Sequence, residues 1–181
     1  KRLFVFILAF SFYHCIYCQW FPQYSGVSEL LVSTCFIDGR NGFVAGYNGT
    51  ILKTNDGGIN WEIVYNDSMA ILKSLSLPTT DTAYVAGHNG LLLKTVDGGT
   101  NWSEIIIDSN YNFQSVFFIN SQTGYIAGNN IDWGPAAVFK TTDGGSNWLV
   151  SYLLPYHTFW DVYFKDIDIG YVIGSQVGAE P

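Results

Sequence analysis

Positive charge is scarce in this sequence. Its 181 residues include 15 Asp and Glu against 8 Lys and Arg, and the arginines are Arg2 and Arg40. The formal net charge is −7 at pH 7. An acidic surface repels phosphate backbones, so the sequence predicts no nucleic-acid partner. Charged residues make up 13% and hydrophobic residues 48%, which excludes a disordered chain and a highly charged coiled coil.

Long apolar runs are also rare, and the one that stands out covers residues 3–13, directly after Lys1 and Arg2. A short apolar run behind positive charge is typical of a secretory signal, and it is too short to span a bilayer. We therefore predict a signal peptide over residues 1–18, an exported protein, and no transmembrane segment in the mature chain. A buried core strand is the rival interpretation of this run.

Cysteine and histidine are too few for most site chemistry. Cys15 and Cys18 fall inside the predicted signal peptide, which leaves Cys35 and excludes a disulfide framework in the mature chain. No Ser/His/Asp, Cys/His, HExxH or phosphate-loop pattern is present. The sequence thus predicts no enzyme, no metal and no cofactor.

What the sequence does contain is a repeat. Residues 43–54, 84–95 and 125–141 are near-copies, and each leads into a Thr-x-Asp-Gly-Gly-x-Asn-Trp box. Gly46, Gly87 and Gly128 are spaced by 41 residues, and the third copy carries five extra residues within residues 129–135. A period of this length with short alternating strands is typical of a four-stranded propeller blade.

We therefore predict an all-β fold, a β-propeller of four-stranded antiparallel blades, present as a partial propeller. The expected blades cover residues 31–65, 72–107, 113–152 and, truncated, 159–181. Trp20 precedes Leu31 by the same 11 residues that separate each box Trp from the next first strand. Residues 19–30 are therefore expected to be a closing strand, whose partner strands would follow in a longer reading frame.

The boxes resemble the Asp-box, or BNR repeat, and with the preceding Gly-rich strand pair they look most like the photosystem II stability/assembly factor family. This resemblance implies a non-enzymatic assembly chaperone in a lumen or periplasm that docks a membrane-protein subunit through an arginine-rich patch. Here Arg40 is the one arginine outside the predicted signal peptide. The sequence therefore favours an exported scaffold, secreted, periplasmic or at the cell surface, that binds a protein or a glycan.

The boxes themselves are expected to be structural. Their Gly-Gly pairs permit the positive φ of a tight turn, their aspartates accept hydrogen bonds from the turn, and their tryptophans pack between blades. Calcium binding is the rival, but the loops lack alternating oxygen ligands. Lys53, Lys94 and Lys140 precede the boxes and are either turn anchors or a basic stripe. The structural residues are Asp56, Gly57, Trp61, Asp97, Gly98, Trp102, Asp143, Gly144 and Trp148.

Sialidases and other glycoside hydrolases share the box, and the alternative prediction is an enzyme of this type whose catalytic residues lie outside this sequence. A sialidase needs an arginine triad, which Arg2 and Arg40 cannot supply. A glycosidase needs paired carboxylates, for which Asp67, Asp108 and Asp132 are the candidates. All three lie among turn residues, where solvated aspartates are the rule.

A partner is expected on the rim of the propeller opposite the boxes. That rim combines the loop between the second and third strands of each blade with the connections between blades, and its sequence varies. Loops that vary on a rigid scaffold are the usual place for binding. The rival interpretation is that Trp133 folds back onto its blade. The candidate residues are Tyr47, His88, Tyr111, Asp132, Trp133, Tyr156 and His157.

Overall fold

The structure is a computed structural model that describes residues 22–177, and every regular element in that range is a β-strand. The strands form three four-stranded sheets and one two-stranded sheet. They are β1 (Leu31–Phe36), β2 (Gly42–Gly46), β3 (Ile51–Thr54) and β4 (Glu62–Tyr65); β5 (Leu72–Ser76), β6 (Ala83–Gly87), β7 (Leu91–Thr95) and β8 (Ser103–Ile106); β9 (Tyr111–Phe118), β10 (Gly124–Asn130), β11 (Ala136–Thr141) and β12 (Leu149–Leu154); and β13 (His157–Phe164) and β14 (Gly170–Gln176).

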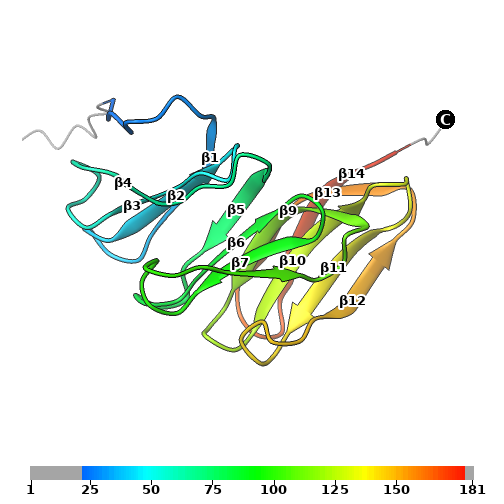
Figure 1. Cartoon of the computed structure of the whole chain (residues 1–181). Coiled ribbons are helices and arrows are strands. Elements are labelled where there is room, and N and C mark those ends of the chain that lie inside the picture. The colour runs from blue at the N-terminus through cyan, green and yellow to red at the C-terminus, as the bar shows by residue number, and fades with distance from the viewer. Residues whose placement is uncertain (1–21, 178–181) are drawn as a thin grey trace, which may run out of the picture.

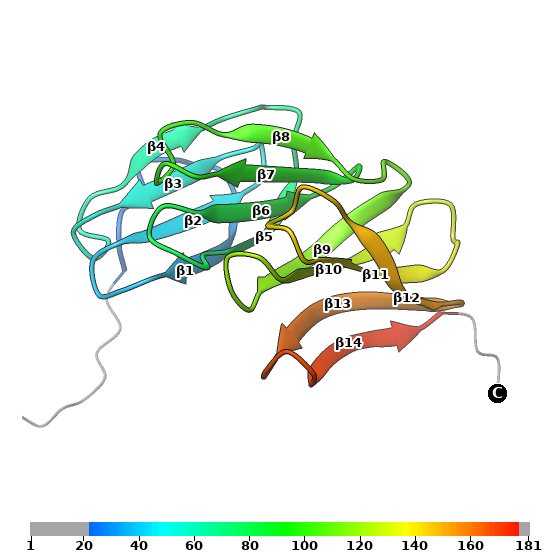
Figure 2. The same ribbon diagram turned by 90° about the horizontal axis from the view of Figure 1, so that it is seen from below.

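Each sheet is an antiparallel meander whose strands pair in chain order. The sheets lie side by side in sequence order, from β1–β4 to β13–β14 (Figures 1 and 2). The first strands of neighbouring sheets contact one another, β1 with β5, β5 with β9 and β9 with β13. This arrangement is that of propeller blades around an axis and confirms the predicted all-β partial propeller.

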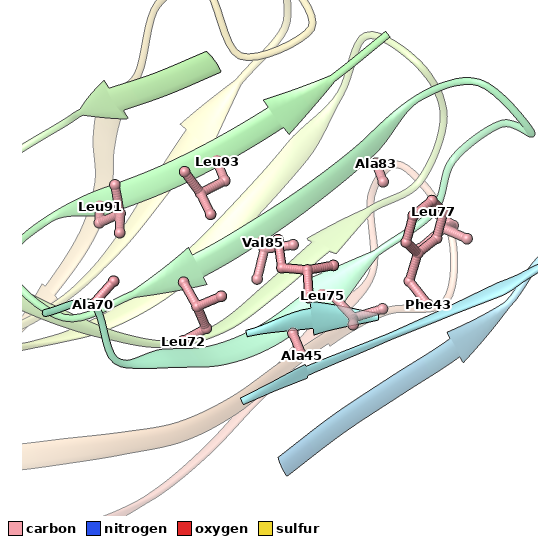
Figure 3. Packing of buried hydrophobic residues seen from close by; sticks show 11 residues of the cluster. Phe43, Ala45, Ala70, Leu72, Leu75, Leu77, Ala83, Val85, Leu91 and Leu93 are labelled. Carbon is pink, nitrogen blue, oxygen red and sulfur yellow. The ribbon is translucent and has the colours of Figure 1, made fainter. Parts of the chain in front are cut away.

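The hydrophobic core lies between blades rather than within one. Phe43 and Ala45 of β2 pack with Leu75 of β5 and Val85 of β6 in a single cluster (Figure 3). A second cluster joins blades two and three, and a third joins blades three and four. Because both faces of a middle strand meet a neighbouring blade, β6 is buried at every position. Such strands read as continuous apolar runs and not as alternating ones.

Backbone contacts define the two rims. On the box rim, the Gly57 N–H donates to the Arg40 carbonyl (2.9 Å), which joins a box to the loop between the first two strands of its blade. On the opposite rim, the Gly90 N–H donates to the Tyr111 carbonyl (2.7 Å), which joins a second-to-third-strand loop to a blade connection. We call this opposite side the variable rim. The rims predicted from the sequence are therefore the ones that form.

Two predictions concern the N-terminal segment, the signal peptide and the closing strand, and the structure tests neither. The signal peptide, residues 1–18, and Trp20 lie outside the described residues. Residues 22–30, the described part of the predicted closing strand, form no strand. The closing strand at residues 19–30 stays a prediction because residues 19–21 lie outside the described range. The fourth strands begin one residue after the box Trp, as β4 does at Glu62, and not at the Trp itself. Within residues 22–177 there is no helix that could cross a membrane.

Candidate functional site

The box turns are closed by their own side chains. In the first box the Thr54 hydroxyl donates to Asp56 Oδ1 (2.8 Å) and accepts the Gly58 N–H (2.9 Å). The Asn60 N–H and side-chain amide donate to the two oxygens of Asp56 (3.0 and 2.8 Å). Gly57 and Gly58 take φ values of 80° and 88°, which other residues rarely adopt. The other two boxes repeat these bonds around Asp97 and Asp143.

These bonds stabilise the ionised carboxylates. Hydrogen bonds from the backbone and side chain of Asn60, and then from Thr54, lower the pKa of Asp56 to about 2. The equivalent asparagine and threonine lower the pKa of Asp97 and of Asp143 to about 2 as well. Each carboxylate accepts three hydrogen bonds from the threonine and asparagine of its own box, as Asp56 does, so the geometry assigns the box aspartates to the turns.

The repeated lysines anchor the next blade. Lys53 Nζ donates to the Gly98 carbonyl of the second box (2.7 Å), and Lys94 Nζ donates to the Gly144 carbonyl of the third (2.7 Å). Each ammonium also lies over an aromatic ring of its own blade, Phe43 at 5.9 Å and Tyr84 at 5.5 Å. The lysines therefore act as turn anchors, and the basic-stripe interpretation has no support from Lys53 and Lys94.

The three box tryptophans differ in whether they pack within their own blade or against a neighbouring one. Trp102 meets Phe43 of the preceding blade edge-on at 5.9 Å, and Trp148 packs in the cluster between blades two and three. Trp61 instead meets Phe36 of its own blade at 6.0 Å. The predicted packing between blades thus forms for Trp102 and Trp148.

Three of the predicted binding residues are not displayed to solvent. Tyr111 is buried in the core against Phe139, with ring centroids 5.1 Å apart, which corrects the expectation that it faces a partner. Tyr47 is half-buried beneath Lys73, whose ammonium lies 5.7 Å from the ring centre. His88 is half-buried, and burial together with Lys73 lowers its pKa. The local alternation carried this signal, because Tyr111 and Phe113 are separated by polar Asn112 and therefore share the inward face of β9.

Three other candidates come together. Trp133, Tyr156 and His157 line one hollow of about 190 Å³ between blades three and four, which we call the aromatic hollow. Its remaining walls are Asn129, Asn130, Gly134, Thr158 and Val177. The side chains of Trp133 and Tyr156 are 84% and 75% exposed, so Trp133 does not fold back onto its blade.

The five-residue insertion builds one wall of the aromatic hollow. In blades one and two the same loop is a tight Asn-Gly turn with positive φ at both residues, as at Asn89 and Gly90. In blade three the loop leaves β10 at Asn130, whose side-chain oxygen accepts the N–H groups of Asp132 (2.9 Å) and Gly134 (3.2 Å). The Ile131 N–H donates to the Asn110 carbonyl (2.9 Å) and ties the loop to the preceding connection.

The other wall is fixed to the first by one side chain. Asn129 of β10 accepts the Phe159 N–H of β13 (2.6 Å) and donates to the Phe159 carbonyl (2.9 Å). On that side Nδ1 of His157 lies 2.7 Å from the Pro155 carbonyl. A carbonyl can only accept, so Nδ1 carries a proton and Nε2 is left for another partner. The sequence did not predict that Asn129 links the two blades. The available signal was a polar residue at the start of the loop that carries the insertion.

Backbone strain is concentrated at the aromatic hollow. Among residues 22–177 the non-glycine residues with positive φ are Asn48, Asn89, Trp133 and Tyr156. Asparagine tolerates this conformation in turns, but bulky aromatic residues do so at a cost. Both aromatic walls of the hollow, at φ 60° and 57°, carry that cost. Strain of this kind gathers at functional sites and points to a use for these two rings.

Two of the remaining carboxylate candidates bond to turns, and Asp67 also lines a second hollow of about 250 Å³ with His88 and Glu104. Asp67 accepts the Met69 N–H (3.0 Å), and Asp108 accepts the N–H and side-chain amide of Asn110 (3.0 and 2.9 Å). Asp132 is exposed on the insertion. In the part of the chain that the structure describes, no three His, Cys, Asp or Glu side chains gather in a way that would hold a metal ion.

Blades with box turns, joined by lysine anchors and inter-blade cores, define an Asp-box β-propeller. The chain belongs to the photosynthesis system II assembly factor YCF48 family, whose family model matches residues 15–151. Among curated proteins the search found no significant match.

Solved structures agree with the family. A YCF48 bound to a D1 peptide shares 27% identity over 67% of this chain, with a TM-score of 0.59, and YCF48 from Cyanidioschyzon merolae shares 26% over 67%, with a TM-score of 0.56. The chain spans 40% and 37% of those two chains. An ancestral GH74 enzyme matches at 19% identity over 65% of this chain and 18% of its own, with a TM-score of 0.51, a likeness of fold alone.

Proposed function

We propose that this protein is a non-enzymatic binding module that holds a polypeptide partner at the aromatic hollow. The observation that carries the proposal is the exposure of Trp133 and Tyr156 around one concave site on the variable rim. Rigid aromatic side chains lose little conformational entropy on binding and supply most of the energy of many protein interfaces. The backbone that carries the two rings is joined across the blades by the Asn129 bonds to Phe159, which sets the position of the hollow before a partner arrives.

The family supports a protein partner over a glycan. A relative with 27% identity carries a bound D1 peptide, so the propeller of this family is able to hold a peptide in at least that protein. Export belongs to the same proposal and depends on the predicted signal peptide at residues 1–18.

Selection from a random dodecapeptide display library tests the proposal. The full chain is the bait, and the Trp133→Ala chain is used for counter-selection. We expect peptides that bind the unmodified chain about tenfold or more tightly than Trp133→Ala, as for an aromatic hot spot. A glycan array run in parallel gives the opposing result: glycan capture without peptide enrichment would overturn a polypeptide partner.

Photosystem assembly is a second candidate, favoured by the family and by the D1 peptide in a relative. Against it, Arg40 is the one arginine among residues 22–177, and its carbonyl and surroundings belong to the box rim. Titration with a D1 peptide and its scrambled version distinguishes the two. Binding of the D1 peptide alone would favour photosystem assembly, and no binding would favour another partner.

An enzymatic role receives little support from the described residues. The GH74 likeness is one of fold, and fold does not carry activity. Asp67 and Asp108 use their side chains to hold turns, and the box carboxylates are saturated by their own loops.

A further inference from the structure

We infer that the aromatic hollow takes a basic side chain, the Arg or Lys of a polypeptide partner. This inference rests on the proposed function and names the chemistry of that partner.

The rings of the hollow suit a cation. Tryptophan and tyrosine faces attract guanidinium and ammonium groups, and the attraction strengthens when the cation is partly desolvated. Trp133 and Tyr156 line the same hollow with most of their surface free, so a cation entering it meets aromatic walls that no other group of the described chain covers. The chain already uses this contact internally, where Lys140 lies 5.4 Å from the Tyr125 ring centre.

The charge that adjoins the hollow in the sequence is negative. Asp132 directly precedes Trp133 on the insertion and is exposed. The Ile131 N–H is bonded to the Asn110 carbonyl in the connection that also carries Asp108. Carboxylates at a rim raise the local concentration of cationic partners and speed their association.

The cations of the described chain are placed elsewhere. Lys53 and Lys94 are bonded to box carbonyls, Lys73 lies over Tyr47, and the Arg40 carbonyl holds the first box turn. Lys140 ends β11 next to the third box, and Lys165 starts the loop after β13 on the same rim. No lysine or arginine among residues 22–177 lines the hollow, so no internal cation competes for its rings.

Neutral chemistry fits less well. Asn130 and Asn129 use their side-chain oxygens within the fold, and Nε2 of His157 is one of the few polar groups of the hollow without a bond in the described structure. An acidic partner would meet Asp132 and the net charge of −7. The aromatic walls and the carboxylate together favour a cation that is also partly apolar, which describes the arginine and lysine side chains.

The test compares charged and neutral versions of one ligand. Dodecapeptides selected against the full chain are synthesised as pairs, in which each Arg is replaced by citrulline and each Lys by norleucine. We expect the neutral version to bind about tenfold or more weakly, and Asp132→Asn to weaken the charged peptide about three- to tenfold with little effect on the neutral one. Binding is measured by calorimetry at low and at high salt.

Matched variants locate the site. Trp133→Ala is expected to lose about tenfold or more in affinity for the charged peptide, because the ring supplies the cation contact. Trp160→Ala, which removes another exposed tryptophan outside the hollow, is expected to change it less than about twofold. Circular dichroism checks that both variants are folded.

The outcomes separate the two levels of the proposal. Selected peptides that bind equally well without their positive charge would overturn the basic side chain and leave the polypeptide partner standing. Charged peptides that are unaffected by Trp133→Ala would overturn the assignment to the hollow. A library that yields no binding peptide would overturn the proposed function itself.

Discussion

At the scale of single residues, the box aspartates bond within the fold, whereas the aromatic side chains of the hollow are exposed. Asp56, Asp97 and Asp143 are fully used by their own turns, and their low pKa values record that use. Trp133 and Tyr156 make no comparable use of their side chains within the described fold and adopt a costly backbone conformation. The first group therefore belongs to the scaffold, and the exposed rings of the second group are the ones that we propose for the partner.

The box carboxylates make stability depend on acid pH. Their pKa is about 2 in the folded state against 3.8 for a free aspartate, so the stabilisation is fully present above about pH 4 and is lost as pH falls through about 2. Replacing all three by Asn should lower stability at pH 7 and flatten its decline between pH 4 and pH 2. Urea unfolding at a series of pH values measures this. Asp132→Asn is the control, and an equal effect there would contradict the interpretation.

The strain at Trp133 can be measured with two substitutions. Both Trp133→Ala and Trp133→Gly remove the ring, but glycine alone adopts positive φ freely. We expect the Gly variant to be more stable than the Ala variant by about 1 kcal/mol in urea unfolding.

The same pair at Trp160, in β13, is the control for this comparison. Its φ is not positive, so glycine should there be the less stable of the two. A Gly variant at position 133 that is also the less stable would show that Trp133 carries no backbone strain.

At the scale of elements, a blade is a rigid unit with one adjustable loop. Box turns, lysine anchors and inner-strand contacts recur from blade to blade, whereas the loop after the second strand varies. In blade three that loop is held by Asn130, and Asn129 joins β10 to β13. The insertion therefore adds a wall to the aromatic hollow and lengthens the strands on either side, since β10 has seven residues and β11 six, against five each in β6 and β7.

Removing the insertion should separate binding from folding. Deletion of residues 131–135 with Ala136→Gly recreates the Asn-Gly turn of the other blades. We expect stability to change by less than about 1 kcal/mol, because shortening a surface loop alters its closure entropy little, and peptide binding to be lost. Thermal unfolding and calorimetry measure the two effects.

A second loop variant controls for length. When residues 131–135 become a Gly/Ser segment of the same length, binding should again be lost while the fold is kept. Retained binding in either variant would exclude the insertion as a wall of the site.

At the scale of the whole molecule, stability is passed from blade to blade through shared cores. Phe43, Tyr84 and Tyr125 occupy equivalent positions in β2, β6 and β10, and each packs against the following blade or its box. Interior strands are covered on both faces, whereas the fourth strand of a blade, such as β8, is largely exposed. The outer edge of a blade should therefore be less stable than its interior.

Hydrogen exchange tests this gradient. Amides of β6 and of residues 124–128 in β10 should exchange most slowly, and those of β8 faster, because local opening is easiest where few apolar contacts are lost. Amide exchange followed by mass spectrometry on overlapping peptides would show the order. Equal protection of β6 and β8 would contradict a core shared between the inner strands of neighbouring blades.

Much of this architecture follows from the sequence because its causes are local. A Gly-Gly pair after Thr-x-Asp closes the same turn wherever it occurs, and a period of about 41 residues fixes where each blade begins. The division into a box rim and a variable rim follows from strand order alone. For that reason the seven candidate residues lie on the variable rim, and binding of a partner at that rim stays a prediction.

Only the tertiary structure decided which candidates share a site. Trp133 lies in the loop between β10 and β11, whereas Tyr156 lies in the connection between β12 and β13. The hollow forms between them because Asn129 joins the two blades. Tyr111 has the same residue type and rim but turns into the core against Phe139. Sequence period sets the position of a side chain along a blade, whereas exposure depends on the neighbouring blade, whose contacts are long-range and leave no local pattern.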